Sequence, residues 1–160
     1  MMKKLILPLI LTLGFTGCAS VPTVAPEHAG LIKTLTTPEA GKAVILVYRE
    51  KSLKGAALKK DLWVNGECLG ESARGVYFFK QVDGGRTHTV STESEFSPNH
   101  LKVSTEVGKK YYVKQFIKMG VMTGGAGLEQ VSTEEGEKEI AQLQPAKSGA
   151  CSKARINVPA

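Results

Sequence analysis

The sequence predicts a mainly β protein, an antiparallel β-sandwich of seven or eight short strands with one C-terminal α-helix, after an N-terminal signal segment. Apolar or alternating segments recur between Gly41 and Val131, with glycine-rich or polar turns about every ten residues. Asn65-Gly66 stands between two such segments, and this dipeptide favours a two-residue hairpin turn. A late acidic segment that ends before Pro145 has the spacing of a capped helix, which would pack on the sandwich.

Residues 1–17 have the pattern of a secretory signal peptide. Lys3 and Lys4 precede an apolar run over residues 5–13, and the small residues Thr16 and Gly17 follow it. The apolar run is about a dozen residues long, shorter than the ~20 that a membrane-spanning helix needs. We therefore expect a cleaved segment that is not part of the folded domain.

Phe15-Thr16-Gly17-Cys18 resembles the lipobox of bacterial lipoproteins, although Phe15 departs from the usual leucine. The resemblance implies that Cys18 becomes the mature N-terminus and carries a thioether-linked diacylglycerol and an amide-linked fatty acid such as palmitate. Ala19 in place of Asp implies export to the outer membrane, where the protein would face the periplasm. The two acyl chains of the diacylglycerol and the amide-linked fatty acid would together anchor the protein firmly in a membrane. The alternative is an ordinary cleaved signal peptide followed by a chance cysteine.

The charge of the chain argues against nucleic acid as a partner. The formal net charge is +6, and Lys3 and Lys4 of the predicted signal peptide contribute two of these charges. No run of consecutive Lys or Arg is longer than two, whereas nucleic-acid binding favours a concentrated basic stripe. The modest positive charge suits anionic lipid or phosphate groups, or serves solubility.

The predicted organisation has four parts: a signal peptide at 1–17, a lipidated N-terminus and flexible tether at 18–37, the sandwich with its helix at 38–144, and a C-terminal tail at 145–160. Pro22, Pro26 and Pro38 interrupt regular structure in the tether, where residues 31–35 form a small apolar island that would dock on the domain. We expect the tail beyond Pro145 to be loose apart from Cys151.

The strands follow from the apolar pattern along the chain. Lys42–Arg49 is apolar on both faces, as in a strand covered on two sides. The alternation in 101–107 would bury Leu101, Val103 and Val107. The expected strands lie at 42–49, on each side of the Asn65-Gly66 turn within 62–69, and at 76–82, 87–94, 101–107, 111–119 and 128–131. The glycine-rich segment 120–127 would be a flexible connection between the last strands, and the alternative is a mobile lid or a loop that binds a partner.

The helix is predicted after Ser132. Glu135 follows three residues later, which is the spacing of a capping box, and the acidic first turns suit the helix dipole. Ile140 and Leu143 would supply the apolar contact with the sheet, and Pro145 would end the helix.

The segment 111–119 carries the most informative candidate surface. Alternation places Tyr111, Val113, Gln115, Ile117 and Met119 on the core side. The opposite side interleaves two aromatic and two basic residues, which could hold a sugar, a phosphate or a partner protein: Tyr112, Lys114, Phe116 and Lys118. In the alternative interpretation, Tyr112 and Phe116 lie under the C-terminal helix while the lysines extend outward.

Cys68 and Cys151 remain as an even pair once Cys18 is lipidated. In an oxidising compartment they are candidates for a disulfide that closes a loop of about 80 residues, worth roughly 4 kcal/mol. The alternative is a buried free Cys68 and an exposed Cys151, with Cys68 open to redox or metal chemistry.

The sequence offers no catalytic residue, metal site or cofactor site that we would name. The segment 120–127 lacks the Gly-Lys-Ser/Thr that a phosphate-binding loop needs. His28, His88 and His100 show no metal-ligand spacing, and Gly-x-Ser-x-Gly is absent. Glu93 and Glu95 share a strand face and imitate a carboxylate pair, but such acids usually form a solvated face.

Several short motifs together resemble the bacterial lipoproteins carrying domain of unknown function 2846. The matching segments, whose order carries the resemblance, are Pro38–Ala43, Val44–Arg49, Leu62–Gly66, Gly70-Glu71, Gly85–Val90, Gly108–Lys114 and Leu128-Glu129 leading to the acidic helix. Val64–Val90 is also similar to PEGA and carboxypeptidase-regulatory-like sandwiches, of prealbumin or immunoglobulin type. The resemblance covers residues 38–144 and supplies no catalytic residue.

The expected function is therefore that of a membrane-anchored envelope lipoprotein with a non-enzymatic binding or structural module. Its partners would be the membrane, through the N-terminal lipid, and an envelope protein or glycan. A small envelope hydrolase or carbohydrate-active enzyme is the alternative.

Overall fold

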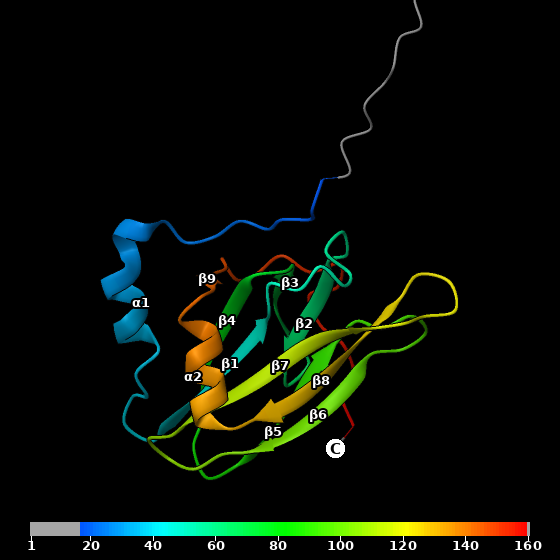
Figure 1. Ribbon diagram of the computed structural model, residues 1–160. Helices are drawn as coiled ribbons and strands as arrows, with labels where there is room; N and C mark the ends of the chain where they lie inside the picture. Colours follow the sequence, from blue (N-terminus) through cyan, green and yellow to red (C-terminus); the bar gives the residue numbers. More distant parts are fainter. Residues whose placement is uncertain (1–16, 160) are drawn as a thin grey trace, which may run out of the picture.

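The computed structural model describes residues 17–159 and confirms the mainly β fold, with two sheets packed face to face (Figure 1). Residues 1–16 of the predicted signal peptide lie outside the described residues. Within the described part, no helix has the length and apolar content to cross a membrane. The elements are η1 (Pro26–His28), α1 (Ala29–Leu35), β1 (Lys42–Arg49), β2 (Lys60–Val64), β3 (Glu67–Ser72), β4 (Val76–Asp83), β5 (Thr87–Thr92), β6 (Asn99–Ser104), β7 (Lys110–Lys118), β8 (Gly125–Val131), α2 (Thr133–Ile140) and β9 (Gln144–Pro145).

The larger sheet has the strand order β8-β7-β1-β4-β9, and the smaller sheet has the order β3-β2-β5-β6. The chain leaves the larger sheet after β1 to form the β2–β3 hairpin and returns in β4. It leaves again to form the β5–β6 hairpin and returns in β7. Because of these crossings β7 lies parallel to β1, and the short β9 lies parallel to β4, while the other pairs are antiparallel.

Both faces of β1 are buried, as its apolar pattern predicts. One set of its side chains packs between the two sheets (Ala43, Ile45, Val47), and the other packs on the outer face of the larger sheet (Val44, Leu46, Tyr48). Ile32 of α1, Tyr112 of β7 and Leu143 after α2 belong to the same outer cluster. The helices thus close the outer face of the larger sheet, and the smaller sheet closes its inner face.

Two local predictions are confirmed in atomic detail. Asn65 and Gly66 form the β2–β3 turn with φ angles of 53° and 79°, the left-handed values that a turn of this type requires. The Ser132 side chain accepts a hydrogen bond from the Glu135 backbone N–H at 3.2 Å and so caps α2.

Three predictions about strand ends are wrong. Val107 is 58% exposed because β6 ends at Ser104 and Val107 lies in the turn before β7. Met119 is 88% exposed because β7 ends one residue earlier, at Lys118. The glycine-rich segment is partly a strand: β8 begins at Gly125 and pairs with β7. A side chain at Gly127 would collide with the Phe116 ring and the Lys118 stem, which explains the glycine.

The segment expected to be a flexible tether is instead bound along the sandwich. The Ala19 N–H donates to the Ala56 carbonyl at 2.9 Å, and the Val24 N–H donates to the Pro145 carbonyl at 2.8 Å. α1 then places Ile32 against the larger sheet. Backbone N–H groups of this segment therefore form hydrogen bonds with the domain. The proline-rich composition of the segment gives no sign of these distant partners.

The C-terminal tail is also fixed, where the sequence predicted a loose segment. Cys68 and Cys151 form a disulfide with a sequence separation of 83 residues and a Cα–Cα distance of 6.0 Å. The Asp61 carboxylate accepts hydrogen bonds from the Ser152 backbone and hydroxyl, and the Trp63 ring N–H donates to the Lys153 carbonyl at 2.8 Å. The tail thus covers the outer side of β2 and β3, and polar contacts rather than an apolar pattern hold it there.

Candidate functional site

Three loops meet at the end of the sandwich where β1, β5 and β7 finish, and together with Cys18 we call them the loop end. They are residues 50–59, 93–98 and 119–124, and they gather at one end of the molecule in Figure 1. A Cβ added at Gly124 would lie 3.3 Å from Leu58 Cδ1, so the first and third loops lie side by side. Gly55 lies directly over Ile117 of β7, where no side chain would fit.

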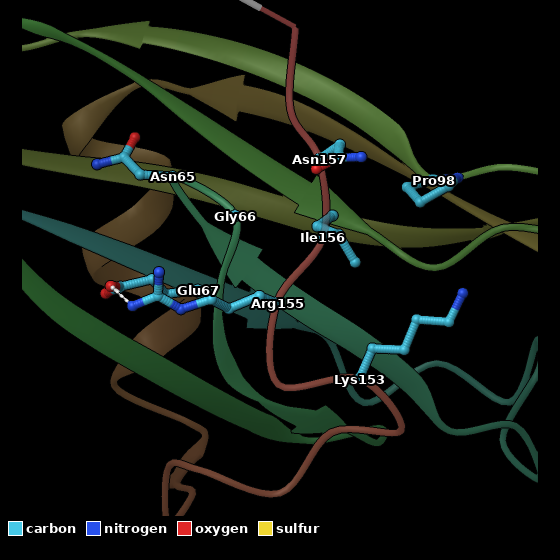
Figure 2. Close-up of a pocket in the computed structure, with 8 residues that line it drawn as sticks. All are labelled: Asn65, Gly66, Glu67, Pro98, Lys153, Arg155, Ile156 and Asn157. Atoms are coloured by element: carbon cyan, nitrogen blue, oxygen red, sulfur yellow. Dashed lines mark hydrogen bonds and ion pairs between the residues drawn. The ribbon is translucent and has the colours of Figure 1, made fainter.

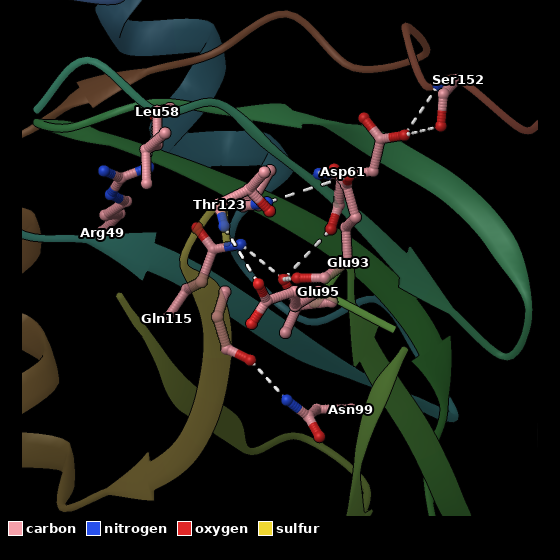
Figure 3. A network of polar contacts seen from close by, with 12 residues as sticks. Arg49, Leu58, Asp61, Glu93, Glu95, Asn99, Gln115, Thr123 and Ser152 are labelled. Atoms are coloured by element: carbon pink, nitrogen blue, oxygen red, sulfur yellow. Dashed lines mark hydrogen bonds and ion pairs between the residues drawn. The ribbon is translucent and has the colours of Figure 1, made fainter. Parts of the chain in front are cut away.

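A buried arginine fixes the first of these loops. Arg49 at the end of β1 is 3% exposed, and its guanidinium donates to the Leu58 carbonyl at 2.8 Å and to the Gly55 carbonyl (Figure 3). Burial, with a smaller contribution from the Arg74 charge, lowers the pKa of Arg49. A buried guanidinium needs acceptors for its fixed set of donors, and the carbonyls of loop 50–59 supply them. This pairing defines the path of the loop.

A carboxylate fixes the third loop. Glu95 accepts hydrogen bonds from three consecutive backbone N–H groups: Val121 at 2.8 Å, Met122, and Thr123 at 3.0 Å (Figure 3). These bonds are the main cause that holds the pKa of Glu95 below its ordinary value of 4.5. The backbone of 119–124 is therefore turned inward toward Glu95, and its side chains point away.

The side chains that the loop end presents to solvent are mostly apolar. It carries five of the eight large apolar side chains that are exposed within residues 17–159, each at least 80% exposed: Leu53, Phe96, Met119, Val121 and Met122. Apolar side chains gathered at one end, on loops fixed from within, indicate a contact surface.

Cys18 lies beside the same loops. It is a free, exposed cysteine, and the next residue, Ala19, is hydrogen-bonded to Ala56 in loop 50–59. The Arg74 guanidinium lies 3.4 Å from the Cys18 sulfur. The predicted lipidation site thus leaves the domain at the end that exposes the apolar loops.

The predicted interaction surface on β7 is divided in the structure. Tyr112 is not available, because its ring lies under Gly136 of α2 and is 4% exposed. Burial, with the Glu137 carboxylate adding to it, raises the pKa of Tyr112 to about 12. The alternative interpretation is therefore confirmed for Tyr112 but wrong for Phe116, which lines a cleft between loop 50–59 and β7 instead of lying under α2.

The other three residues of that surface lie nearer the loop end. Lys114 forms an ion pair with Glu50 at 3.3 Å, and both line a small cleft of about 180 Å³ between loop 50–59 and β7. Phe116 lines the same cleft, and the Lys118 ammonium lies 5.8 Å from the centre of its ring. These residues flank the loop end but do not form a separate site with Tyr112.

The residues that imitate catalytic or metal-binding chemistry are occupied in structural contacts. Both ring nitrogens of His88 are hydrogen-bonded, one to the Asn65 amide at 2.9 Å and the other to the Asp83 carbonyl at 2.8 Å. Glu93 lies 3.9 Å from the Lys60 ammonium, while Glu95 holds the third loop. Among residues 17–159 no three His, Cys, Asp or Glu side chains come close enough to hold a metal ion.

A second hollow lies between the β2–β3 hairpin and the C-terminal tail (Figure 2). It has a volume of about 590 Å³, and its lining is Asn65, Gly66, Glu67, Pro98, Lys153, Arg155, Ile156 and Asn157. Glu67 occupies its charged wall, since it pairs with Arg155 at 3.1 Å and with Lys80 at 3.0 Å. The ion pairs occupy Glu67 and Arg155, so the charged groups of this wall are bound to each other.

Sequence reasoning missed Arg49, the loop end and the role of Glu95. It placed Glu95 with Glu93 on a strand face, whereas β5 ends at Thr92 and Glu95 binds the backbone of the third loop. A lone Leu53 in a polar loop and a Val121-Met122 pair between glycines were the available signals. Neither signal shows that the loops share one end of the fold, because that follows from the two chain crossings between the sheets.

The fold and the loop end define a small β-sandwich protein that exposes apolar side chains on loops held by Arg49 and Glu95. Comparison with known proteins gives its family: the model of the family described as "Protein of unknown function (DUF2846)" matches residues 39–126, and the chain belongs to this family. It is also 46% identical over 133 residues to a protein of Haemophilus influenzae described as uncharacterized, across 83% of this chain and 78% of that protein. The family match spans β1 to the start of β8, so it includes all three loops of the loop end.

Proposed function

We propose that this protein is an outer-membrane lipoprotein, acylated on Cys18, that displays its sandwich as a non-enzymatic binding or structural module in the periplasm. The observation that carries the proposal is that two of the three cysteines form a disulfide and the third, Cys18, is free. Cys68 and Cys151 are joined to each other, which suits an oxidising compartment. Cys18 is free and exposed directly after the predicted cleavage site. A lipid on its sulfur would meet no obstacle from the domain.

The loop end supports the module part of the proposal. Its backbone is held by Arg49 and Glu95, so its exposed side chains are presented in a fixed arrangement. Preorganised apolar groups lose little conformational entropy on binding, which favours a contact surface. The partner would be another envelope component, protein or glycan.

The test of the anchor is metabolic labelling with radioactive palmitate. We expect the wild-type protein to incorporate the label and to accumulate as a precursor when globomycin blocks lipoprotein signal peptidase. Cys18→Ala should lose both the label and the membrane association, whereas a Cys68→Ala/Cys151→Ala control should keep both. A Cys18→Ala protein that still partitions with membranes would contradict the proposal.

The outer-membrane assignment has its own test. Ala19→Asp introduces the residue that retains lipoproteins of this type at the inner membrane. On a sucrose gradient of separated membranes we expect the wild-type protein in the outer-membrane fractions and the variant in the inner-membrane fractions. An unchanged distribution would remove the outer-membrane part of the proposal and leave the acylation intact.

The alternative, an envelope hydrolase, depends on acids and histidine that converge in a cleft. Glu93, Glu95 and His88 each have structural partners instead. No observation on these residues favours the hydrolase over the binding module.

A further inference from the structure

We propose that the loop end rests directly on an anionic bilayer surface, with the side chains of loops 50–59 and 119–124 at the level of the lipid headgroups. This inference rests on the proposed acylation of Cys18 and adds to it a second, non-covalent membrane contact. The inference assigns the loop end to a bilayer in place of the envelope protein or glycan of the broader proposal, and three observations select the bilayer.

The first observation is the length of chain between the lipid and the fold. The Ala19 N–H is hydrogen-bonded to Ala56 at 2.9 Å, so a single residue separates the acylated sulfur from a fixed point on loop 50–59. Consecutive Cα atoms lie about 3.8 Å apart. Acyl chains attached at Cys18 cannot enter a bilayer unless loop 50–59 comes to its surface. No flexible linker between Cys18 and loop 50–59 would hold the domain away from the bilayer.

The second observation is the apolar character of this end. Leu53 is 80% exposed in the loop that holds Ala19, and Met119, Val121 and Met122 are exposed in the neighbouring loop. Exposure of these side chains to water is unfavourable. At a bilayer surface the same side chains are removed from water, which is the driving force of interfacial binding.

The third observation is charge. Arg74 contacts both Cys18 and the Lys51 carbonyl, Lys54 lies in the same loop 50–59, and Lys118 lies at the base of loop 119–124. None of these four forms an ion pair with a carboxylate of residues 17–159, whereas Lys59, Lys60 and Lys114 in the same region do: the partners are Glu71, Glu93 and Glu50. Each basic residue near an anionic membrane strengthens binding about fivefold. The positive charge beside the exposed apolar side chains is therefore complementary to a layer of anionic lipid headgroups.

The test uses the full-length protein purified from membranes and reconstituted into vesicles of phosphatidylcholine and phosphatidylglycerol that carry brominated acyl chains. Leu53→Cys and Met122→Cys are labelled with a small fluorophore. The control is Val107→Cys, an exposed apolar position in the turn before β7, at the opposite end of the sandwich. We expect strong quenching at positions 53 and 122 and none at 107.

A charge variant tests the second component of the contact. Lys51→Gln/Lys54→Gln should lower the quenching at position 122 toward the level of the 107 control, since about fivefold of affinity is lost with each charge. Lys138→Gln, which removes an exposed cation from α2, should leave the quenching unchanged. Equal quenching at 53, 122 and 107 in acylated protein would overturn the inference, and so would quenching that the Lys51/Lys54 variant leaves unaltered.

The acylation state is read separately on the wild-type protein, by mass and by the reactivity of its thiols. A blocked Cys18 with no quenching refutes the membrane contact alone. A free Cys18 refutes the lipoprotein proposal, and the contact is then decided by co-sedimentation of the full chain with the same vesicles. Co-sedimentation that the Lys51→Gln/Lys54→Gln change abolishes supports the contact, and absence of co-sedimentation overturns it.

Discussion

The contact between α2 and β7 is tested most sharply at Gly136. A Cβ added there would lie 2.1 Å from Cγ of Tyr112 and 2.4 Å from its Cβ. Non-bonded carbons rest about 3.5 Å apart, so Gly136→Ala requires the helix or the ring to move by roughly 1.4 Å. The Tyr112 side chain is 4% exposed, so its neighbours enclose it on nearly all sides.

Two effects of opposite sign decide the result of Gly136→Ala. Alanine is the better helix former by about 1 kcal/mol, which favours the variant. Overpacking of a closed contact costs ~1–3 kcal/mol, and the required shift puts this contact at the upper part of that range. We therefore expect Gly136→Ala to lower the free energy of unfolding by about 1–2 kcal/mol.

The assay is urea unfolding followed by the fluorescence of Trp63, the single tryptophan, which is 2% exposed. The midpoint should fall by roughly 0.5–1 M. The matched control is Gly30→Ala in α1, where an added Cβ meets nothing within 4 Å. That variant should keep or raise the stability, by up to about 1 kcal/mol. If both variants stabilise the protein, Tyr112 does not lie under α2 as described.

Two further predictions concern Glu95 and the disulfide. The hydrogen bonds to loop 119–124 depress the pKa of Glu95 below 4.5, so they should be complete above pH 4.5 and be lost as the pH falls through the lower, folded value. In NMR spectra the backbone amide protons of residues 121–123 should follow this titration, and Glu95→Gln should abolish it; a midpoint at or above 4.5 would contradict the contact. Removing the disulfide by Cys151→Ser should lower the stability by about 4.5 kcal/mol, because the bridge to Cys68 closes a loop of 83 residues. Urea unfolding of oxidised wild-type protein and of the variant measures this difference, and a loss under about 1 kcal/mol would show that the tail contacts act independently of the bridge.

The parts of the fold that the sequence predicts are those in which one local pattern decides the structure. Lys42–Arg49 alternates between two apolar clusters and could only be covered on both faces. The turn at Asn65-Gly66 and the cap at Ser132 depend on neighbours within three residues. Each of these predictions is confirmed because tertiary contacts agree with the local preference.

Where partners are distant in sequence, the same reasoning fails. The tail after Pro145 has no apolar period, yet Asp61 and Trp63 bind its backbone from about ninety residues away. Met119 continues the alternation of its strand, but the β7–β8 hairpin turns one residue earlier. Nothing local distinguishes these cases from a loose tail or a longer strand.

The candidate site follows the same division. Cys18 is identified by the residues beside it, and its acylation stays a prediction. The loop end could not be anticipated, because Glu95 meets residues 121–123 only after the chain has crossed between the sheets. The alternation of aromatic and basic residues on β7 is visible in the sequence, but it left open whether Tyr112 faces a partner or lies under α2. The contact with Gly136 decides for the helix.

Hydrogen bonds between the N-terminal and C-terminal segments constrain the order in which parts of the chain can fold. Val24 is bonded to Pro145 and Lys147 to Pro22, so residues 22–24 acquire their partners only when the last tenth of the polypeptide has been made. Contacts of such long separation form late. Residues 22–24 are thus made early and paired late. A chain that stops short of residue 145 would leave them without these partners, although Ala19 would keep its bond to Ala56.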